Sequence, residues 1–535
     1  MKIQYILSSI LLAGAVLLTS CEDKLDQTQH GVDSIDSFYK TDADAESALS
    51  SIYGAVLHVY GYQYTVKMAL GDDSWTGGGG HNDGTYLLGD LTYDEAESNL
   101  TGLYEYLYKV VYAANIMLAN VEEDTPAKKQ YCAEARVLRA YTYFDLVTLW
   151  GTPPLITEPL EAGNYQQPNS TSAEIWAQIE ADLTSAINSN ALVEKNSVNQ
   201  ENGSYRVTKQ FAQALLGKAY LWQKKYTEAA TMLDNVINSG KYKLYALPGS
   251  GEELENLCQE IGEDNCESIF EINWFRDITQ PRIYNAPMVT WAWGVFLGWR
   301  TSDRLNCSAL NPSWDIHTAT WGRWNPRKDL YNAFVSEEGE NGYRLRATII
   351  TLNELLDNGA TYFNDLNDNE GYFQWKYRFQ TKSAMSSFWC SNNFRVMRLG
   401  EVYLLAAEAY IQSGNTAKGA EYINAVRDRA RVAARATGTM DELKLEKRLE
   451  MAYDATRFQD LQRWGLQEAL GSWKGKQYPT VRQEYDANNK PIFKGDSQIY
   501  WTQTAGSYSA KVDLLPFPQS EMNTNPNCVQ QSAWQ

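Results

Sequence analysis

The chain has 535 residues, of which 44% are hydrophobic, and it carries 66 Asp and Glu against 47 Lys and Arg. This apolar content excludes wholesale disorder and suffices for a large core. The formal net charge of -19 argues against a nucleic-acid partner, because phosphate binding needs clustered Lys and Arg. Aromatic residues make up 13% of the chain, most of them amphipathic Tyr and Trp, which is a first indication of a binding surface.

The N-terminus has the pattern of an exported lipoprotein. An uncharged apolar run, residues 6–18, is shorter than the roughly 20 residues of a membrane-spanning helix and is typical of a signal peptide. It ends in Leu18-Thr19-Ser20-Cys21, in which small residues suit a lipoprotein signal peptidase and the thiol receives the lipid. We expect residues 1–20 to be cleaved and the mature chain to be anchored to a membrane by lipidated Cys21.

Residues 21–42 are polar and acidic, with Glu22, Asp23 and Asp26 close to the anchor. One interpretation is a solvated tether that holds the folded body away from the bilayer. Another is a signal for export to the cell surface, formed by acidic residues beside the lipidated cysteine. The two interpretations are compatible, and both stay open.

The other six cysteines form no CxxC pair and no zinc-site spacing. An exported chain permits disulfides, and Cys258 and Cys266, which flank an acidic loop, are the best candidates for a pair. Cys132 lies in a helical pattern and is expected to be a buried thiol.

Helical periodicity dominates residues 43–242. Steps of four and three place one apolar helix face at Ala133, Val137, Ala140, Phe144 and Val147. This helix should end at Trp150-Gly151, where glycine suits the C-cap and two prolines follow. Thr208 is expected to cap a helix that runs to about residue 224, and further helices are expected over about 45–59, 103–121 and 172–188.

Two segments have the pattern of a tetratricopeptide hairpin, in which small residues let two antiparallel helices approach and bulky ones fill the groove. The first spans about residues 213–237 and has its pattern at Leu216, Gly217, Tyr220, Ala229, Leu233 and Val236. The second has the same register at Ala407, Tyr410, Gly419, Ile423 and Val426. We therefore predict a mainly α fold built on tetratricopeptide-like hairpins.

Residues 243–394 interrupt the helical pattern with many Gly, Asn, Asp and Trp. A long irregular region inside a helical scaffold is typical of a functional insertion. We expect loops and a few short strands there, for instance over residues 267–274. The mature chain then divides into the tether, a helical region over 43–242, an irregular ligand-binding excursion over 243–394, and a C-terminal region over 395–535.

Catalytic motifs are scarce, and we expect no enzyme. The four His form no HExxH motif, and no Gly-x-Ser-x-Gly is present. Paired carboxylates suit a glycoside hydrolase, but among 66 acidic residues any pair is unremarkable. Residues 365–371 begin like a calcium loop, yet Glu370 replaces the turn glycine and Lys376 the bidentate Glu, which favours a polar turn over a structural calcium site.

Seven of the 17 tryptophans lie within residues 274–324 of the excursion. Trp291 and Trp293 would face one side of an extended segment. Sugar rings combine an apolar face with a hydroxyl fringe, and flat aromatic rings bordered by polar groups match that surface. A single indole is by default a core residue, but we expect part of the cluster to bind ligand. Stacking worth roughly 1–2.5 kcal/mol per ring predicts affinities of about micromolar to millimolar.

Four segments resemble the SusD/RagB family of glycan-binding outer-membrane lipoproteins: Ala133–Leu155, Arg395–Tyr410, Glu446–Gly465 and Leu514–Asn527. The resemblance implies four tetratricopeptide-like hairpins that support an irregular ligand face. It also implies a surface-exposed protein of the outer membrane that forms the lid of a SusC-type TonB-dependent transporter. The Arg side chains of the shared segments suggest buried ion pairs of Arg139, Arg398 and Arg457, with Glu134, Glu408 and Asp460 as partners.

Ligand residues of the family come from an early loop and the central excursion. By position these correspond here to Trp75, His81, Asn82, Asp83, Tyr284, Trp291, Trp293, Trp321 and Trp324. The favoured hypothesis is a non-catalytic receptor that captures oligosaccharide or polysaccharide and delivers it to the transporter. The alternatives are a peptide-capturing receptor on the same scaffold, since some relatives take up peptides, and a lipid-anchored glycoside hydrolase.

Overall fold

The computed structural model describes residues 38–77, 84–201, 203–273, 304–310, 312–314, 320–362, 364–378, 384–386, 389–390 and 392–535, with Leu297, Ile316 and Gln380. The expected signal peptide, Cys21 and most of the tether lie outside these residues. Among the helices of the described part, none combines the length and the apolar character needed to cross a bilayer.

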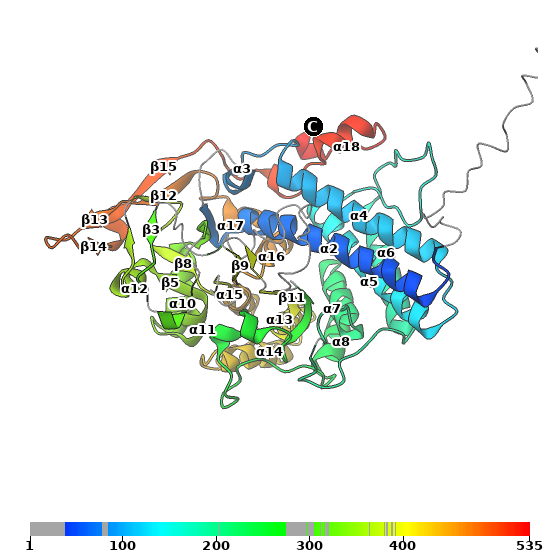
Figure 1. The fold of residues 1–535 in the computed structure, drawn as a ribbon, viewed down its shortest axis with the longest axis horizontal. Helices are drawn as coiled ribbons and strands as arrows, with labels where there is room; N and C mark the ends of the chain where they lie inside the picture. Colours follow the sequence, from blue (N-terminus) through cyan, green and yellow to red (C-terminus); the bar gives the residue numbers. More distant parts are fainter. Residues whose placement is uncertain are drawn as a thin grey trace, which may run out of the picture.

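Long helices form the N-terminal part of the molecule, on the right of Figure 1. They are α2 (Asp42–Leu70), α4 (Ser98–Asn120), α5 (Pro126–Trp150), α6 (Ser172–Asn188), α7 (Lys209–Trp222) and α8 (Tyr226–Ile237), with the short α3 (Gly84–Gly89) between α2 and α4. The predicted helices over 172–188 and from Thr208 onward are confirmed. The helix predicted over 45–59 is part of the longer α2.

Local capping explains where these helices begin and end. The side chain of Thr208 accepts a hydrogen bond from the backbone N–H of Phe211 at the start of α7, as predicted. At the end of α5, Gly151 has φ 74° and its N–H donates to the carbonyl of Val147. Glycine adopts this left-handed conformation without the strain of a Cβ, so the predicted stop at Trp150 is confirmed.

The two predicted hairpins are α7 with α8, and α13 (Leu399–Gln412) with α14 (Thr416–Arg429). A Cβ on Gly217 would lie 2.6 Å from Cγ of Leu233, and one on Gly419 would lie 2.5 Å from Cγ1 of Ile411. Both glycines are therefore required for close helix approach, as the repeat pattern predicts. Helix α8 packs against α13, so the two hairpins are in contact, and α2 packs against α4 and α5 against α6.

Short elements form the central part of the chain. The helices are α10 (Lys328–Glu338), α11 (Tyr343–Thr348) and α12 (Leu352–Asp357). The strands are β1 (Ser74–Gly77), β2 (Ser268–Ile272), β3 (Leu305–Asn306), β4 (Arg323–Pro326), β5 (Ile349–Thr351), β6 (Thr361–Tyr362), β7 (Leu366–Asn367), β8 (Tyr372–Gln374), β9 (Ala384–Ser386), β10 (Trp389–Cys390) and β11 (Phe394–Arg398). The predicted strand β2 pairs antiparallel with β11, so the first strand of the excursion lies beside the segment in which the scaffold resumes.

The C-terminal region continues with α15 (Met440–Glu450), α16 (Arg457–Trp464), α17 (Leu466–Leu470), β12 (Gln477–Val481), β13 (Glu484–Tyr485), β14 (Pro491–Ile492), β15 (Ile499–Gln503) and α18 (Gln519–Thr524). Strand β12 lies between β15 and β7, and these strands extend to the left in Figure 1. The chain then returns to the N-terminal helices, because the indole N–H of Trp150 donates to the carbonyl of Pro516 at 2.8 Å.

The prediction of buried ion pairs is confirmed for Arg139 and Arg398, whereas the pair of Arg457 is only partly buried, and the predicted partners are wrong. Arg139 pairs with Asp182, Arg398 with Glu267, Glu450 and Asp454, and Arg457 with Asp72. Glu134, Glu408 and Asp460 instead pair with Arg206, Arg463 and Lys447. The true partners come from other elements of the fold, which sequence spacing does not reveal.

The expected pair Cys258–Cys266 is not formed. Both residues are buried free thiols. Cys258 belongs to the main hydrophobic core, whereas the Sγ of Cys266 lies 4.0 Å from a carboxylate oxygen of Glu252. Cys132 is also a buried free thiol, as predicted.

Candidate functional site

Strands β1 and β4 pair antiparallel and bring the early loop and the central excursion together. Trp75 lies opposite Asn325, and Gly77 lies opposite Arg323. Gly77 has φ 63°, and a Cβ there would lie 2.1 Å from the carbonyl oxygen of Gly322. Only glycine permits this approach. The two segments from which ligand residues are predicted are therefore joined at one ribbon.

The prediction that Trp324 binds ligand is wrong. Its side chain is fully buried, at 0% exposure, and its ring meets that of Tyr64 edge to face. Trp324 has φ 59°, a left-handed conformation that interrupts the extended strand, and its side chain belongs to the main hydrophobic core.

Trp75 lies below the surface, at 8% exposure, and does not offer the open platform predicted for it. Its indole N–H donates to Oε2 of Glu370 at 2.7 Å. Its ring meets the rings of Trp473 and Trp501 edge to face, with centroids 5.5 and 5.8 Å apart. Trp501 is 43% exposed. Trp75 therefore supports an accessible ring instead of presenting one.

Trp473 and Trp501 were not among the predicted ligand residues, because both lie outside the tryptophan-rich excursion. The guanidinium group of Arg327 lies over the ring of Trp473, 3.4 Å from its centroid. A local signal exists for Trp501 in β15, where adjacent aromatic residues Tyr500 and Trp501 precede polar Thr502 and Gln503 in a strand whose last four residues are exposed.

Trp321 lies just before β4, close to the end of the β1–β4 ribbon, and is partly exposed. This position places Trp321 at the junction of the two predicted ligand segments. The other predicted ligand residues lie outside the described part of the chain, so their arrangement stays a prediction: His81, Asn82, Asp83, Tyr284, Trp291 and Trp293.

The segment that begins like a calcium loop supports the β1–β4 ribbon. Oδ2 of Asp368 accepts hydrogen bonds from the hydroxyl of Thr76 at 2.9 Å and from the N–H of Gly77 at 3.3 Å. Glu370 accepts from Trp75, as above. The two carboxylates are thus directed at different donors, and both hold the ribbon in place.

Burial raises the pKa of Asp368 to about 7. Protonation of this carboxyl group therefore contributes stability below its unfolded pKa of about 4, and the contribution is lost as the pH rises through 7. We expect Asp368→Asn to raise the free energy of unfolding at pH 8 by at least about 1 kcal/mol, with the gain vanishing near pH 4. Urea unfolding at several pH values measures this difference. The exposed Asp357→Asn is the control, and an equal gain at all pH values would contradict the assignment.

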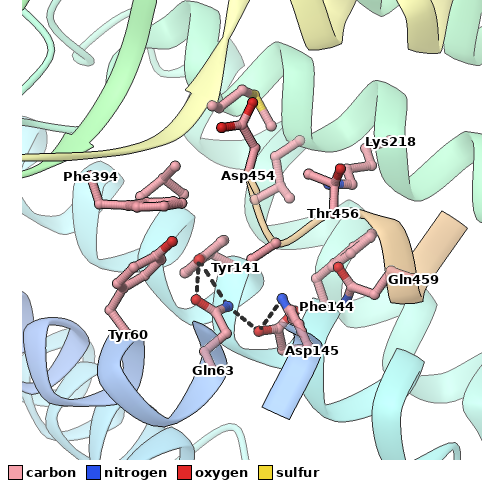
Figure 2. Close-up of a pocket in the computed structure, with 15 residues that line it drawn as sticks. Tyr60, Gln63, Tyr141, Phe144, Asp145, Lys218, Phe394, Asp454, Thr456 and Gln459 are labelled. Carbon is pink, nitrogen blue, oxygen red and sulfur yellow. Dashed lines mark hydrogen bonds and ion pairs between the residues drawn. The ribbon is translucent and has the colours of Figure 1, made fainter. Parts of the chain in front are cut away.

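A small cavity lies inside the helical body and is shown in Figure 2. Its centre is Asp145, whose carboxylate accepts hydrogen bonds from Lys67 at 2.8 Å and from Gln459 at 2.9 Å. Gln63 points toward both Asp145 and Tyr141 in the same view. The cavity volume of about 40 Å³ is close to that of a single water molecule, so it is too small for a sugar ring. Its polar groups join α2 and α5 to α16.

Two family models match the chain. The model described as "SusD family" matches residues 302–534, and the model described as "Starch-binding associating with outer membrane" matches residues 30–221. The chain belongs to the SusD/RagB family. The helices of the scaffold lie mostly within the matched residues. The proposed ligand residues Tyr284, Trp291 and Trp293 lie between the matched parts, in residues 222–301.

Relatives are similar in sequence, and solved structures share the fold, over nearly the whole chain. A SusD-like protein of Bacteroides ovatus is 22% identical, covering 97% of this chain and 96% of its own. A laminarin-binding SusD-like protein of known structure is 25% identical with a TM-score of 0.74, covering 92% of this chain and 100% of its own. Surface glycan-binding protein A from Bacteroides thetaiotaomicron, solved in complex with laminarihexaose, is 21% identical with a TM-score of 0.72, covering 92% of this chain and 99% of its own.

Proposed function

We propose that this SusD-family protein is a cell-surface receptor that captures oligosaccharide or polysaccharide and passes it to a SusC-type TonB-dependent transporter. The observation that carries the proposal is the β1–β4 ribbon, which joins the early loop to the tryptophan-rich excursion beside the partly exposed Trp321. The similarity to a laminarin-binding protein supports a glycan as ligand. We propose His81, Asn82, Asp83, Tyr284, Trp291 and Trp293 as further contacts.

A binding role fits the chemistry around the ribbon better than a catalytic one. A glycoside hydrolase needs two carboxyl groups that face the scissile bond from opposite sides. Here Asp368 and Glu370 are buried and accept hydrogen bonds from backbone, hydroxyl and indole donors that hold the strands in place. Their role is to position the ribbon. We therefore propose that this protein captures the glycan and transfers it, and that separate enzymes cleave it.

The proposed location is the outer face of the outer membrane, with the body attached through lipidated Cys21. This location is supported by the Leu18-Thr19-Ser20-Cys21 sequence and by the description of the matched family model, which names outer-membrane association. Labelling of intact cells with an impermeant reagent tests surface exposure, and Cys21→Ala should release the protein from the membrane fraction. Co-purification of a TonB-dependent transporter with the lipidated protein tests the proposed partner.

Trp321→Ala tests the glycan site. We expect about tenfold weaker binding, because a stacked ring contributes roughly 1–2.5 kcal/mol. Gel retardation across a panel of neutral polysaccharides that includes laminarin identifies the ligand, and calorimetry then measures the affinity. The matched control is Tyr112→Ala, which removes a ring that is 63% exposed on α4, far from β4 in the sequence. Unchanged binding in Trp321→Ala would contradict the assigned site, and a wild-type protein that binds peptides but no polysaccharide would support the peptide-capturing alternative.

A further inference from the structure

An open surface pocket of about 370 Å³ lies where α15, α16 and α17 meet the segment after α2 and the start of α10. In Figure 1 these three helices lie in the middle of the view, between the N-terminal helices and the short strands. The volume is at the lower end of the roughly 300–1,000 Å³ of small-molecule sites. The volume of this pocket is thus much larger than that of the interior cavity around Asp145.

The lining of this pocket, which we call the α16 pocket, includes apolar and aromatic side chains. Leu445, Leu461 and Ala469 line it together with the partly exposed Trp464. The indole N–H of Trp464 donates to Oε1 of Glu408 at 2.9 Å. Since Glu408 is itself buried and paired with a guanidinium group, this hydrogen bond holds the indole ring in a defined plane. A fixed ring beside aliphatic groups suits the apolar face of a sugar.

The lining of the α16 pocket also carries fixed charges of both signs. Arg448 donates to Asp73 at 2.6 Å and to Asp329 at 2.7 Å. Arg457 donates to both carboxylate oxygens of Asp72, at 2.7 and 2.8 Å. These pairs hold planar donors and acceptors in place along the wall.

The charges that line the pocket cancel. Three cationic side chains face three anionic ones: Lys444, Arg448 and Arg457 against Asp72, Asp329 and Glu468. Both guanidinium groups are already engaged by carboxylates, so an anionic ligand would have to displace a protein carboxylate. A neutral ligand with many hydroxyl groups can instead donate to and accept from the paired groups without breaking them. The combination of a fixed ring and neutral hydrogen-bonding walls selects a carbohydrate.

We propose that the α16 pocket is a second glycan-binding site, which takes one or two rings of a neutral polysaccharide with Trp464 as its stacking surface. The inference rests on the proposed function of the ribbon site and extends it. The pocket and the ribbon are connected by contacts, since the carbonyl of Ala469 accepts from the indole N–H of Trp473, whose ring meets that of Trp75. One polysaccharide chain bound at both places gains affinity through effective concentration.

Ala469→Trp tests the proposal, because it fills the pocket without removing a polar contact. We expect polysaccharide binding to become about tenfold weaker through lost avidity, and calorimetry with a hexasaccharide of the same linkage to show one site where wild type shows two. Glu468→Ala, which removes an exposed side chain from the rim, should weaken binding in the same direction if Ala469→Trp fails to fold. Ala434→Trp places the same bulk at an exposed loop position and is the matched control.

The outcomes separate this inference from the proposed function. If wild type binds a polysaccharide, and Ala469→Trp and Glu468→Ala bind it equally well with two sites retained, the α16 pocket is not a glycan site and the ribbon site stands. If Trp321→Ala alone abolishes every trace of binding, the second site is likewise overturned. If wild type binds no member of the polysaccharide panel, the proposed function fails and this inference fails with it.

Discussion

Replacing Arg398 with Met should lower the free energy of unfolding by about 3–5 kcal/mol, the usual cost of removing one charge from a buried network of ion pairs. The Arg398 side chain is 1% exposed and lies 2.7 Å from Glu267 and 2.8 Å from Asp454, with Glu450 also in contact. Without the guanidinium group, these carboxylates lose hydrogen bonds that water does not replace. Methionine fills much of the same volume, so the loss reports the charge and not a cavity.

The matched control for this prediction is Arg435→Met. Arg435 also pairs with a carboxylate, that of Glu337, but its side chain is 62% exposed. An exposed ion pair contributes no more than about 1 kcal/mol. Urea unfolding of wild type and both variants measures the two effects under the same conditions. Equal losses in the two variants would show that burial of the Arg398 network does not determine its contribution.

The Arg398 network has a consequence for the ligand face. Glu267 directly precedes β2, Arg398 ends β11, and Glu450 and Asp454 belong to the segment around the end of α15. The network therefore ties β2 and β11 to the segment around the end of α15. Because β2 and β11 are held this way, we expect Arg398→Met also to weaken glycan binding. If binding is lost only because part of the variant is unfolded, measuring at a lower temperature should restore it.

Gly217→Val should destabilise the first hairpin by about 1–3 kcal/mol, the usual cost of overpacking a tight helix contact. A Cβ at this position would lie 2.6 Å from Cγ of Leu233 and 3.3 Å from the carbonyl oxygen of Ala229. The backbone of α8 would have to move away from α7, and α8 also packs against α13. The change therefore affects the contact between the two hairpins as well.

Gly54→Val separates this steric effect from the change in helix propensity. Gly54 lies inside α2, and no atom lies within 4 Å of a Cβ built on it. Valine has a higher helix propensity than glycine, so the free energy of unfolding of Gly54→Val should stay equal or rise slightly. Thermal unfolding monitored by circular dichroism compares the two variants. A Gly217→Val protein as stable as Gly54→Val would contradict the requirement for glycine at the hairpin crossing.

The scaffold was largely predictable because its signals are local. The Thr208 cap, the stop at Gly151 and the glycines of both hairpins depend on neighbouring residues and on the helical repeat, which the amino-acid order carries directly. The same holds for the ion pairs of Arg139 and Arg398, since a charged residue within an apolar helix face needs a buried partner. The identity of that partner was not predictable, because Asp182, Glu267 and Asp72 belong to other elements.

The ligand face shows the opposite case. The positions of the tryptophans along the chain indicated that aromatic rings gather in the excursion, but not which of them reach the surface. That outcome depends on the pairing of β1 with β4, which turns Trp324 into the core and places Trp75 beneath Trp501. Strand side chains alternate between two faces, and which face is buried depends on the segments packed against it, which come from distant parts of the chain. The sequence by itself therefore determined the helical scaffold and the type of side chain available for binding, whereas tertiary packing decided which rings are accessible.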